Sequence, residues 1–405
     1  MPLTTHDGIA NAVTQERPAT ARHGERPAFD RPLQVGTPNI PDRGRLFQRI
    51  SQALDRGWLT NNGPLVREFE DRLTRLTGAA HVLATGNGTS ALEVLVRARG
   101  LTGEVIVPSF TYVATAHALQ WQGLTPVFAD IDPHTGTLDP AHVRELITER
   151  TSGIVGVHLW GRICRVDELR AIADEHGLAL LYDGAHALGC ELDGRPVGGF
   201  GDGEILSFHA TKFINAFEGG AVLTNDPELA ERVGRMRNFG FGPGREVVTF
   251  GTNAKMNEIS AAMGLTALEH IDEITAANTL RYERYRAGLL GVPGLRLRGP
   301  GPGERSNHQY VVVEIDAAVT GVHRDRLLSA LHEENVFAQR YFHPGCHRMG
   351  PYAQRAGVHT PLPLPGTEAL AERVLVLPSG PALAPHDVDR VCELVRQVLE
   401  AAPAH

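Results

Sequence analysis

The sequence predicts an α/β protein with two domains: a large domain built on a mostly parallel sheet, and a smaller C-terminal α+β domain. Three observations support this prediction. Strand-like and helix-like segments alternate between residues 81 and 224. The strand-like runs are almost continuously apolar, which is typical of strands covered on both faces. After about residue 265 a long helical stretch leads into a mixed segment with fewer strands.

The region before the alternating segment divides into a lead-in and a helical part. Residues 1–33 are rich in Thr, Ala, Arg and Pro and lack the apolar stretch of a signal peptide, so we expect a disordered or extended lead-in. Residues 46–77 follow a helical pattern that breaks at 57–64, where Gly, Asn and Pro predict a loop. A second helix is expected at Leu65–Leu76.

Seven strands and their connecting helices are expected in the large domain, and a smaller set in the second domain. The expected strands of the large domain are His81–Ala84, Val105–Val107, Pro126–Ala129, Ile154–Leu159, Leu178–Tyr182, Glu204–Phe208 and Gly219–Thr224. Its expected helices are Ser90–Arg97, Ala114–Trp121, Ala141–Ile147 and Val166–His176. The small domain is expected to contain strands Tyr310–Ile315 and Val374–Leu377 and helices Arg324–Glu333 and Asp387–Ala401. We therefore place the large, cofactor-binding domain at residues 34–270 and the small domain at 271–405.

Composition narrows the classes of function. With 405 residues and 42% hydrophobic content, the chain is long enough to bury a large core. A net charge of −8 provides no basic surface for nucleic acid, and no apolar run reaches the ~18 residues of a membrane span. The four cysteines are widely spaced without a CxxC pair, so neither a zinc site nor a disulfide framework is expected. A reducing cytoplasm is the expected compartment.

Polar and glycine residues follow the expected strands at their carboxyl ends, the edge at which parallel sheets bind ligands. These segments are Thr85–Thr89, Pro108–Tyr112, His158–Gly161, Asp183–His186 and Ser207–Lys212. We therefore expect a binding site where they converge.

Lysine is rare in this chain. Of 39 basic residues only Lys212 and Lys255 are lysines, and the others are arginines. Unlike arginine, lysine can lose its proton and act as a nucleophilic amine. Apolar neighbours such as Phe208 and Phe213 would desolvate the Lys212 ammonium and lower its pKa. The alternative is an ordinary surface lysine, which the apolar and glycine-rich surroundings disfavour.

The segment Gly86-Asn87-Gly88-Thr89-Ser90-Ala91 matches the G-x-G-x-x-A pattern of dinucleotide-binding folds. That fingerprint also requires an acidic residue at the end of the next strand, whereas Glu104 precedes the strand. A nicotinamide site is therefore disfavoured. Glycines that open a helix still expose backbone N–H groups to a phosphate, and Thr89 adds a hydroxyl. A plain helix cap is the alternative.

Asp183 ends an apolar strand, so its carboxylate is only partly solvated and needs a partner. It could face a pyridinium nitrogen, the contact that a pyridoxal ring requires to act as an electron sink, or it could be an N-cap or a buried ion pair. His186 could orient this carboxylate or be an ordinary histidine. The histidines at 158, 186 and 209 lack metal-ligand spacing, so no metal site is expected.

A phosphate-binding helix start, the aromatic Tyr112, the carboxylate of Asp183 and a desolvated lysine together match the requirements of a pyridoxal phosphate (PLP) site. The surrounding motifs resemble the DegT/StrS family of sugar aminotransferases. The motifs that carry the resemblance are Asp183–Gly189, Ser207–Lys212, Glu218–Ala221, Trp58–Phe69, Pro108–Thr115, Gly251–Met256 and His308–Tyr310. The resemblance runs from about Gln34 to the C-terminus.

Several expectations follow from this resemblance alone. It implies the fold type I architecture of PLP-dependent transferases, whose large domain holds a mostly parallel seven-stranded sheet. It also implies a homodimer with shared active sites, PLP as the cofactor, and transfer of an amino group, with glutamate as the donor, to a keto sugar nucleotide. A related branch that dehydrates its substrate has histidine at the lysine position, and Lys212 argues against that branch.

The resemblance also implies roles for individual residues. Lys212 is expected to be the Schiff-base lysine and Asp183 the partner of the pyridinium nitrogen, with His186 alongside. The other residues expected to bind the cofactor are Gly88, Thr89 and Ser207 at the phosphate, Tyr112 on the ring, and Asn253 at the phosphate of the neighbouring subunit. The family more often has Tyr-Arg or Phe-Arg where this chain has Ala254-Lys255. Lys255 is therefore given no role.

Within the family, Pro126–Asp132, Gly156–Gly161 and Asn215–Glu218 most resemble the C4 aminotransferases of desosamine-type deoxysugar pathways, which act on dTDP-4-keto-6-deoxyglucose. This resemblance implies an enzyme of secondary-metabolite deoxysugar biosynthesis. The alternatives are amino transfer at C3, transfer to another nucleotide keto sugar, a non-catalytic PLP-bound protein, and a nicotinamide-dependent reductase.

Overall fold

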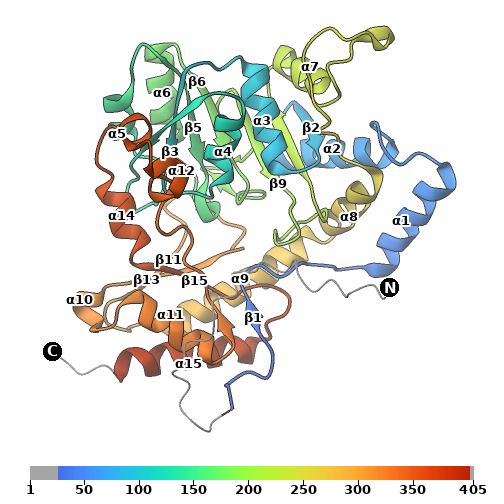
Figure 1. Cartoon of the computed structure of the whole chain (residues 1–405). Coiled ribbons are helices and arrows are strands. Elements are labelled where there is room, and N and C mark those ends of the chain that lie inside the picture. The colour runs from blue at the N-terminus through green and yellow to red at the C-terminus, as the bar shows by residue number, and fades with distance from the viewer. Residues whose placement is uncertain (1–25, 402–405) are drawn as a thin grey trace, which may run out of the picture.

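The computed structural model describes residues 26–401, so most of the expected lead-in, residues 1–25, lies outside the described part of the chain. In the described part, none of the helices is both long and apolar enough to cross a membrane. Figure 1 shows an upper body that contains the large sheet and a lower body with a smaller sheet.

The large sheet confirms the expected fold class. Its seven strands are β2 (His81–Thr85), β3 (Glu104–Pro108), β4 (Thr125–Ala129), β5 (Thr151–Val157), β6 (Ala179–Asp183), β9 (Gly203–Ser207) and β10 (Gly220–Thr224). They are arranged in the order β2-β10-β9-β6-β5-β3-β4. β10 is antiparallel to both of its neighbours, and the other four pairings are parallel.

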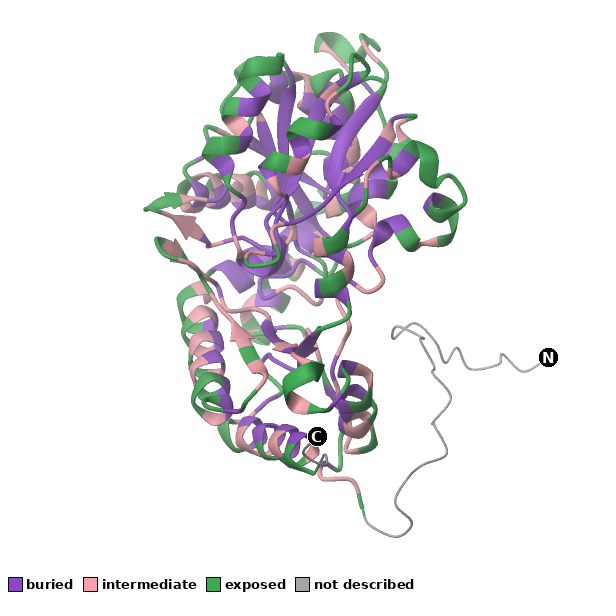
Figure 2. Ribbon diagram, turned by 90° about the vertical axis from the view of Figure 1, so that its left-hand side faces the viewer, coloured by how far each residue is buried: buried purple, intermediate pink, exposed green. Residues whose placement is uncertain are grey.

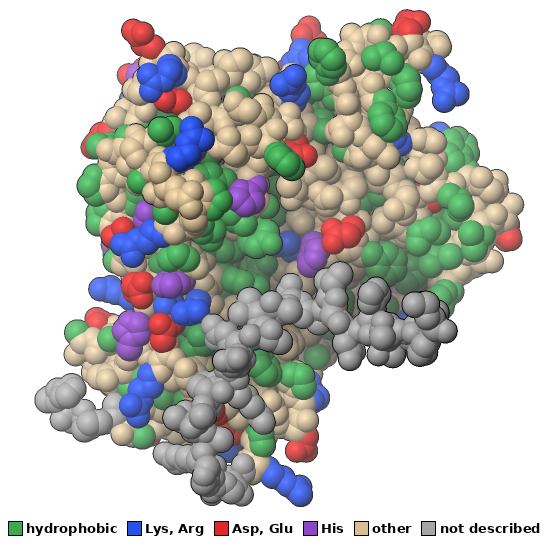
Figure 3. Space-filling model, in the orientation of Figure 1, with side chains coloured by type: hydrophobic (Ala, Val, Ile, Leu, Met, Phe, Trp, Pro, Cys, Tyr) green, Lys and Arg blue, Asp and Glu red, His purple; other side chains and the backbone are tan. Residues whose placement is uncertain are grey.

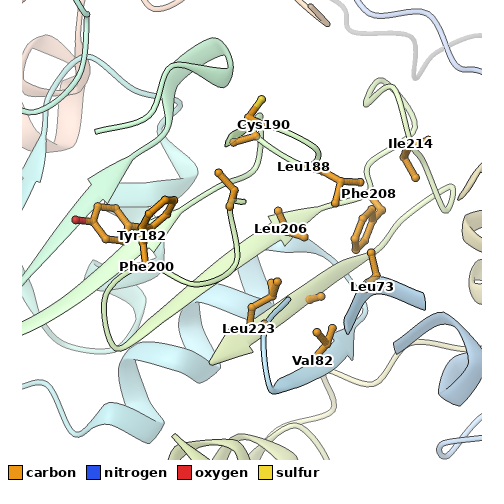
Figure 4. Close-up of a cluster of buried hydrophobic side chains, with 14 of the residues drawn as sticks. Leu73, Val82, Tyr182, Leu188, Cys190, Phe200, Leu206, Phe208, Ile214 and Leu223 are labelled. Atoms are coloured by element: carbon orange, nitrogen blue, oxygen red, sulfur yellow. The ribbon is translucent and has the colours of Figure 1, made fainter. Parts of the chain in front are cut away.

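Helices cover both faces of this sheet, because each strand buries apolar side chains on each side (Figure 2). One face packs against α3 (Gly88–Arg99), α4 (Ala114–Trp121) and α7 (Pro227–Met236). The opposite face packs against α2 (Pro64–Thr77), α5 (Pro140–Leu146), α6 (Val166–His176) and α8 (Glu258–Leu268). Figure 4 shows part of this second core, in which Leu206, Leu223 and Phe208 lie near Leu73 of α2.

α1 (Arg43–Arg56) precedes this core and docks on α8. Gly57 ends the helix with φ 63°, a left-handed conformation that glycine adopts without strain, and its N–H binds the Leu54 carbonyl. Pro64 is the first residue of α2. The loop expected between the two helices is therefore present, and the sequence located it through these two residues.

The lower body begins with α9 (Ile271–Leu289). Its three-stranded antiparallel sheet has the order β11-β13-β15, formed by β11 (Leu295–Arg298), β13 (Val311–Ile315) and β15 (Val374–Leu377). α11 (Arg324–Glu333) and α15 (Pro385–Glu400) share its core. β1 (Leu33–Gln34) pairs in parallel with β14 (Val336–Phe337), so the start of the described chain lies on the lower body.

The remaining elements are short. They are β7 (Glu191–Leu192), β8 (Arg195–Pro196), β12 (Glu304–Arg305), α10 (Ala317–Thr320), α12 (Gly350–Ala353), α13 (Ala356–His359), α14 (Pro365–Ala371) and the 3-10 turns Leu159–Gly161, Pro243–Arg245 and Cys346–Arg348.

Two expected elements differ from the structure. The strand expected at Ile154–Leu159 is Thr151–Val157, because the chain turns immediately after it, with Trp160 at φ 55°. The long helical stretch that was expected to reach Leu289 is two helices, because His270 leaves the helical conformation at φ −116° and ψ 18°. The expected domain boundary at residue 270 lies at this break, and the division into two domains stays a prediction.

Candidate active site

The carboxyl ends of β6 and β9 and the first turn of α3 bound the site. Asp183 is the last residue of β6 and pairs with Ile205 of β9. Lys212 lies in the segment that connects β9 to β10, where its backbone N–H donates to the His209 carbonyl at 2.8 Å. Asp183 and the segment that carries Lys212 thus follow two neighbouring strands at the carboxyl edge of the sheet, the edge at which the sequence predicted a binding site.

The Lys212 side chain is half-buried, and its Nζ lies 3.3 Å from the hydroxyl oxygen of Tyr310. Burial lowers its pKa to about 8, because an ammonium is less stable away from water, while the charges of Asp183 and Tyr112 act in the opposite direction. An appreciable fraction of the amine is therefore unprotonated near neutral pH, which is the form that attacks a carbonyl carbon.

Asp183 is buried, and each carboxylate oxygen accepts one hydrogen bond. Oδ2 accepts from the Thr115 hydroxyl at 2.8 Å, and Oδ1 accepts from the Ala185 N–H at 3.0 Å. Among residues 26–401, Asp183 forms no salt bridge within 4.0 Å. Within the described residues, the Asp183 carboxylate therefore does not form the buried ion pair that the sequence left open as an alternative. Two neutral donors fix its plane and leave its negative charge available to a cationic ligand.

His186 is buried beside this carboxylate but does not hydrogen-bond to it in the described chain. Its Nδ1 accepts from the Trp160 N–H at 3.2 Å, and its ring is stacked with Phe342 at 6.1 Å and 10°. Tyr310 meets the same ring edge-on at 4.7 Å. Burial, with the Lys212 charge as a smaller cause, holds the His186 pKa well below its usual value. His186 is therefore a neutral ring among aromatic side chains.

The start of α3 has the form of a phosphate-binding turn. Asn87 caps the helix by accepting from the Ser90 N–H at 2.8 Å. A Cβ on Gly88 would lie 2.9 Å from the Ser207 Cβ, so glycine allows the helix to approach the end of β9. Thr89 is exposed, and its hydroxyl forms no hydrogen bond within residues 26–401. The N–H groups of Gly88 and Thr89 and the hydroxyls of Thr89 and Ser207 are thus available to an anion.

Two of the expected site residues lie apart from these contacts. Tyr112 is 61% exposed, and its ring centroid is 6.3 Å from that of Phe342 at a tilt of 58°. Asn253 is exposed and accepts a hydrogen bond from Lys255 Nζ at 2.6 Å. No described contact joins Asn253 to Lys212 or Asp183, and its expected role concerns a second subunit.

Several side chains of the site were missed by the sequence analysis. Thr115 lies about one helical turn after Tyr112, in the segment that follows β3. This spacing is the signal that could have identified Thr115. Tyr310 stands in a motif that was recognised but was given no role. Trp160 stands in the strand-end segment His158–Gly161, which was recognised, but it was given no role of its own. Phe342 has no local signal, because it reaches these rings from the segment after β14.

These residues fit the cofactor that the sequence implied. PLP needs a lysine amine, an acidic partner for its ring nitrogen and a set of donors for its phosphate. The chain offers an amine of lowered pKa, a carboxylate without an internal cation, and a glycine cradle at a helix start that a Cβ would fill.

Comparison with known proteins gives the following matches. The model of the DegT/DnrJ/EryC1/StrS aminotransferase family matches residues 42–396. A protein of Shigella dysenteriae named dTDP-4-amino-4,6-dideoxy-D-glucose transaminase is 35% identical over 372 residues, which cover 91% of this chain and 100% of the relative. The crystal structure of DesI in the presence of its TDP-sugar product is 53% identical with a TM-score of 0.89, and the match covers 93% of this chain and 95% of DesI. Helicobacter pylori PseC, an aminotransferase of pseudoaminic acid biosynthesis, is 28% identical with a TM-score of 0.85 over 92% of this chain and all of PseC.

Proposed function

Because the chain belongs to the DegT/DnrJ/EryC1/StrS aminotransferase family, we propose that it transfers an amino group from glutamate to C4 of dTDP-4-keto-6-deoxy-D-glucose. The enzyme class, aminotransferase, and the cofactor, PLP, follow from family membership. The observation that carries the proposal is the amine of Lys212 at the strand edge that also holds Asp183. The product would be a 4-amino-4,6-dideoxy sugar nucleotide of secondary-metabolite biosynthesis.

The similar proteins support the choice of acceptor. The name of the Shigella relative specifies a 4-amino-4,6-dideoxyglucose carried on dTDP. DesI, with about half of its aligned residues identical to this chain, was crystallised with a TDP-sugar product. Both proteins match this chain over nine-tenths of its length, and the family model matches residues 42–396, which include all the residues that bound the site.

The chain's own residues supply the following steps. PLP, when bound, provides an electron sink that stabilises negative charge on the substrate carbon. Lys212 would hold the cofactor covalently between turnovers, and its free amine would then remove a proton from one carbon and return it to another. Asp183 would keep the ring nitrogen protonated. The first turn of α3, with Gly88, Thr89 and Ser207, would bind the phosphate.

We further propose a homodimer with shared active sites in the cytoplasm. Large apolar side chains are exposed on α1 and on the loop that follows α7, including Phe47 at 66% and Phe250 at 86%. Figure 3 shows hydrophobic side chains gathered on the side of the molecule that carries α1. Such surface is rare on monomers. Asn253, three residues after Phe250, would then reach the phosphate bound by the neighbouring subunit. The four cysteines, all free and buried, suit a reducing compartment.

The presence of only two lysines makes a direct test of the cofactor site possible. Borohydride treatment of the purified enzyme should leave the cofactor bonded to the peptide that contains Lys212. Lys212→Arg keeps the positive charge but removes the nucleophile, so it should lose the covalent attachment and all measurable turnover. Lys255→Arg is the matched control for attachment. Attachment to Lys255, or turnover by Lys212→Arg, would contradict the assignment.

The acceptor is tested with a panel of dTDP-keto sugars and glutamate as donor. The proposal expects amination of the 4-keto-6-deoxyglucose compound, with the amine placed on C4 by NMR of the product. An amine on C3, or a preference for another nucleotide, would assign a different acceptor to the same site. Failure of glutamate to convert the bound cofactor to its amine form would indicate a non-catalytic PLP-bound protein.

A further inference from the structure

Tyr310 is the only described side chain that hydrogen-bonds to the Lys212 amine within residues 26–401. Its hydroxyl oxygen lies 3.3 Å from Nζ, and its ring centroid lies 5.9 Å from the same nitrogen. Tyr310 comes from the lower body, as the residue immediately before β13. The lysine and its hydrogen-bonding partner are therefore supplied by different halves of the chain.

The surroundings hold this phenol in place. Its ring meets the His186 ring edge-on at 4.7 Å, and burial raises the Tyr310 pKa well above its usual value. The phenol is therefore neutral throughout the range in which Lys212 titrates. A neutral hydroxyl has both a proton to donate and lone pairs to accept, so it can bond to the lysine nitrogen in either state.

We propose that Tyr310 is a further catalytic residue, whose hydroxyl holds the Lys212 nitrogen in both its protonated and its neutral form. The proposal rests on the proposed role of Lys212. The tyrosine oxygen accepts from the ammonium, and its O–H donates to the lone pair of the neutral amine. Rotation of one hydroxyl thus keeps the nitrogen in one position while it gains and loses a proton, which is what repeated proton transfer requires.

The two hydrogen bonds differ in strength. A bond from a charged donor is roughly twice as strong as one between neutral groups. Tyr310 therefore stabilises the ammonium more than the amine, and opposes part of the effect of burial on Lys212. Removing the hydroxyl should lower the Lys212 pKa further and should leave the nitrogen without a fixed position.

The test measures the Lys212 pKa in the apoenzyme, so it does not depend on activity. Protein labelled with [13C]lysine should give only two side-chain Cε signals, and Lys255→Arg identifies the one from Lys212. Tyr310→Phe should lower the Lys212 pKa by roughly 0.5 to 1 relative to the wild type, from loss of one charge-assisted hydrogen bond. The phenylalanine ring keeps the packing against His186, and the backbone amide spectrum verifies the fold.

Tyr341→Phe is the matched control. Tyr341 is a second partly buried tyrosine of the same aromatic group, stacked with Phe342 at 5.2 Å, and it does not hydrogen-bond to Lys212 in the described chain. Its variant should leave the Lys212 pKa unchanged. An equal Lys212 pKa in wild type and Tyr310→Phe, or an equal shift in both variants, overturns the proposal.

A second measurement distinguishes catalysis from structure. With the loaded enzyme, Tyr310→Phe should lower kcat by at least roughly tenfold and leave KM for the sugar nearly unchanged, because the hydroxyl acts on proton transfer. A change confined to KM contradicts a catalytic role. Failure of the proposed transaminase activity itself would appear as a wild-type enzyme that aminates none of the keto sugars, whereas the NMR result for Tyr310 stands or falls independently.

Discussion

At the scale of single residues, Lys212 and Asp183 are held by different kinds of neighbour. The amine lies near the Tyr310 ring and is hydrogen-bonded to its hydroxyl, whereas the carboxylate accepts from a hydroxyl and a backbone N–H. Burial therefore moves the lysine toward its neutral form, while the carboxylate keeps its oxygens ready for a cation. The same small volume thus offers a nucleophile and an anion.

Asp183→Asn tests whether the negative charge of the Asp183 carboxylate is needed for turnover. The amide keeps the shape and an oxygen for the Thr115 hydroxyl, so we expect the variant to fold and to retain cofactor. Its kcat should fall roughly 100- to 1000-fold, because the charge that stabilises the protonated ring nitrogen is lost. Steady-state kinetics measures the fall in kcat, and the absorbance of the bound cofactor measures whether the variant retains it. Wild-type kcat in the variant would remove Asp183 from the mechanism.

The site residues differ in how visible they are in the sequence. Lys212 and Asp183 stand at strand ends, and rarity of type or an apolar context marks each of them. Tyr310 is 98 residues from Lys212 in the sequence, and Phe342 is more distant in the sequence than Tyr310. Only the packing of the two bodies brings both side chains to the site. From the sequence, His186 could either orient Asp183 or be an ordinary histidine. A neighbour in sequence suggested that contact, but the ring turns toward the Trp160 backbone.

At the scale of elements, helix ends were more predictable than the order of the strands. Glycine caps such as Gly57 and Gly78 act within one turn, so the sequence contains the whole cause. The place of β10 between β2 and β9 depends on its pairing with β2, in which Gly220 lies opposite Thr85, more than a hundred residues earlier, and no local pattern encodes that pairing.

The first turn of α3 is the element that the phosphate would need. Gly88→Ala puts a methyl group 2.9 Å from the Ser207 Cβ, so the helix must move away from β9. We expect the dissociation constant for PLP to rise roughly tenfold or more, from loss of at least one phosphate hydrogen bond. Equilibrium dialysis measures it. Gly357→Ala, at a glycine with open space around it, should leave the affinity unchanged.

α1 is fixed to α8 by one buried cation. Arg49 is 3% exposed and makes a two-pronged contact with Glu269, at 2.5 and 2.9 Å. Hydrogen bonding to Arg49 is the main cause that lowers the Glu269 pKa to about 2. Because the folded pKa lies below the unfolded one, this stabilisation is complete above about pH 4.5 and is lost as the pH falls through about 2.

Glu269→Gln should therefore reduce the free energy of unfolding by roughly 3 kcal/mol at neutral pH, because it leaves Arg49 buried without a counter-charge. Urea unfolding at pH 7 and at pH 3 measures the effect, and the difference between variant and wild type should shrink at the lower pH. A difference that is equal at both pH values would exclude an electrostatic origin.

At the scale of the whole molecule, two bodies meet at the site. The carboxyl edge of the large sheet supplies Lys212 and Asp183, and the chain beyond α9 supplies Tyr310, immediately before β13, and Phe342, after β14. In the homodimer that we propose, the second copy of the chain would cover the exposed apolar side chains around α1 and Phe250. Asn253 would then act in the partner's site.

Mixing two inactive variants tests the shared site. Lys212→Arg and Asn253→Ala homodimers should each be impaired, but a heterodimer contains one site with both changes and one with neither. After unfolding and refolding an equal mixture, we expect activity to recover to roughly a quarter of the wild-type value. Mixing without refolding is the control. Activity equal to the mean of the two separate variants would show that each site belongs to one chain.

The position of β10 also bears on how the protein is made. β2 is the first strand of the large sheet to leave the ribosome, but its only neighbour, β10, is synthesised about 135 residues later. Until β10 has been synthesised, β2 has no partner strand on the nascent chain. Meanwhile the strands from β3 to β6 can pair with one another. β2 can join this sheet only after the segment that carries Lys212, and β10 behind it, have been translated. The segment that carries Lys212 and the strand that pairs with β2 therefore become available at the same stage of synthesis.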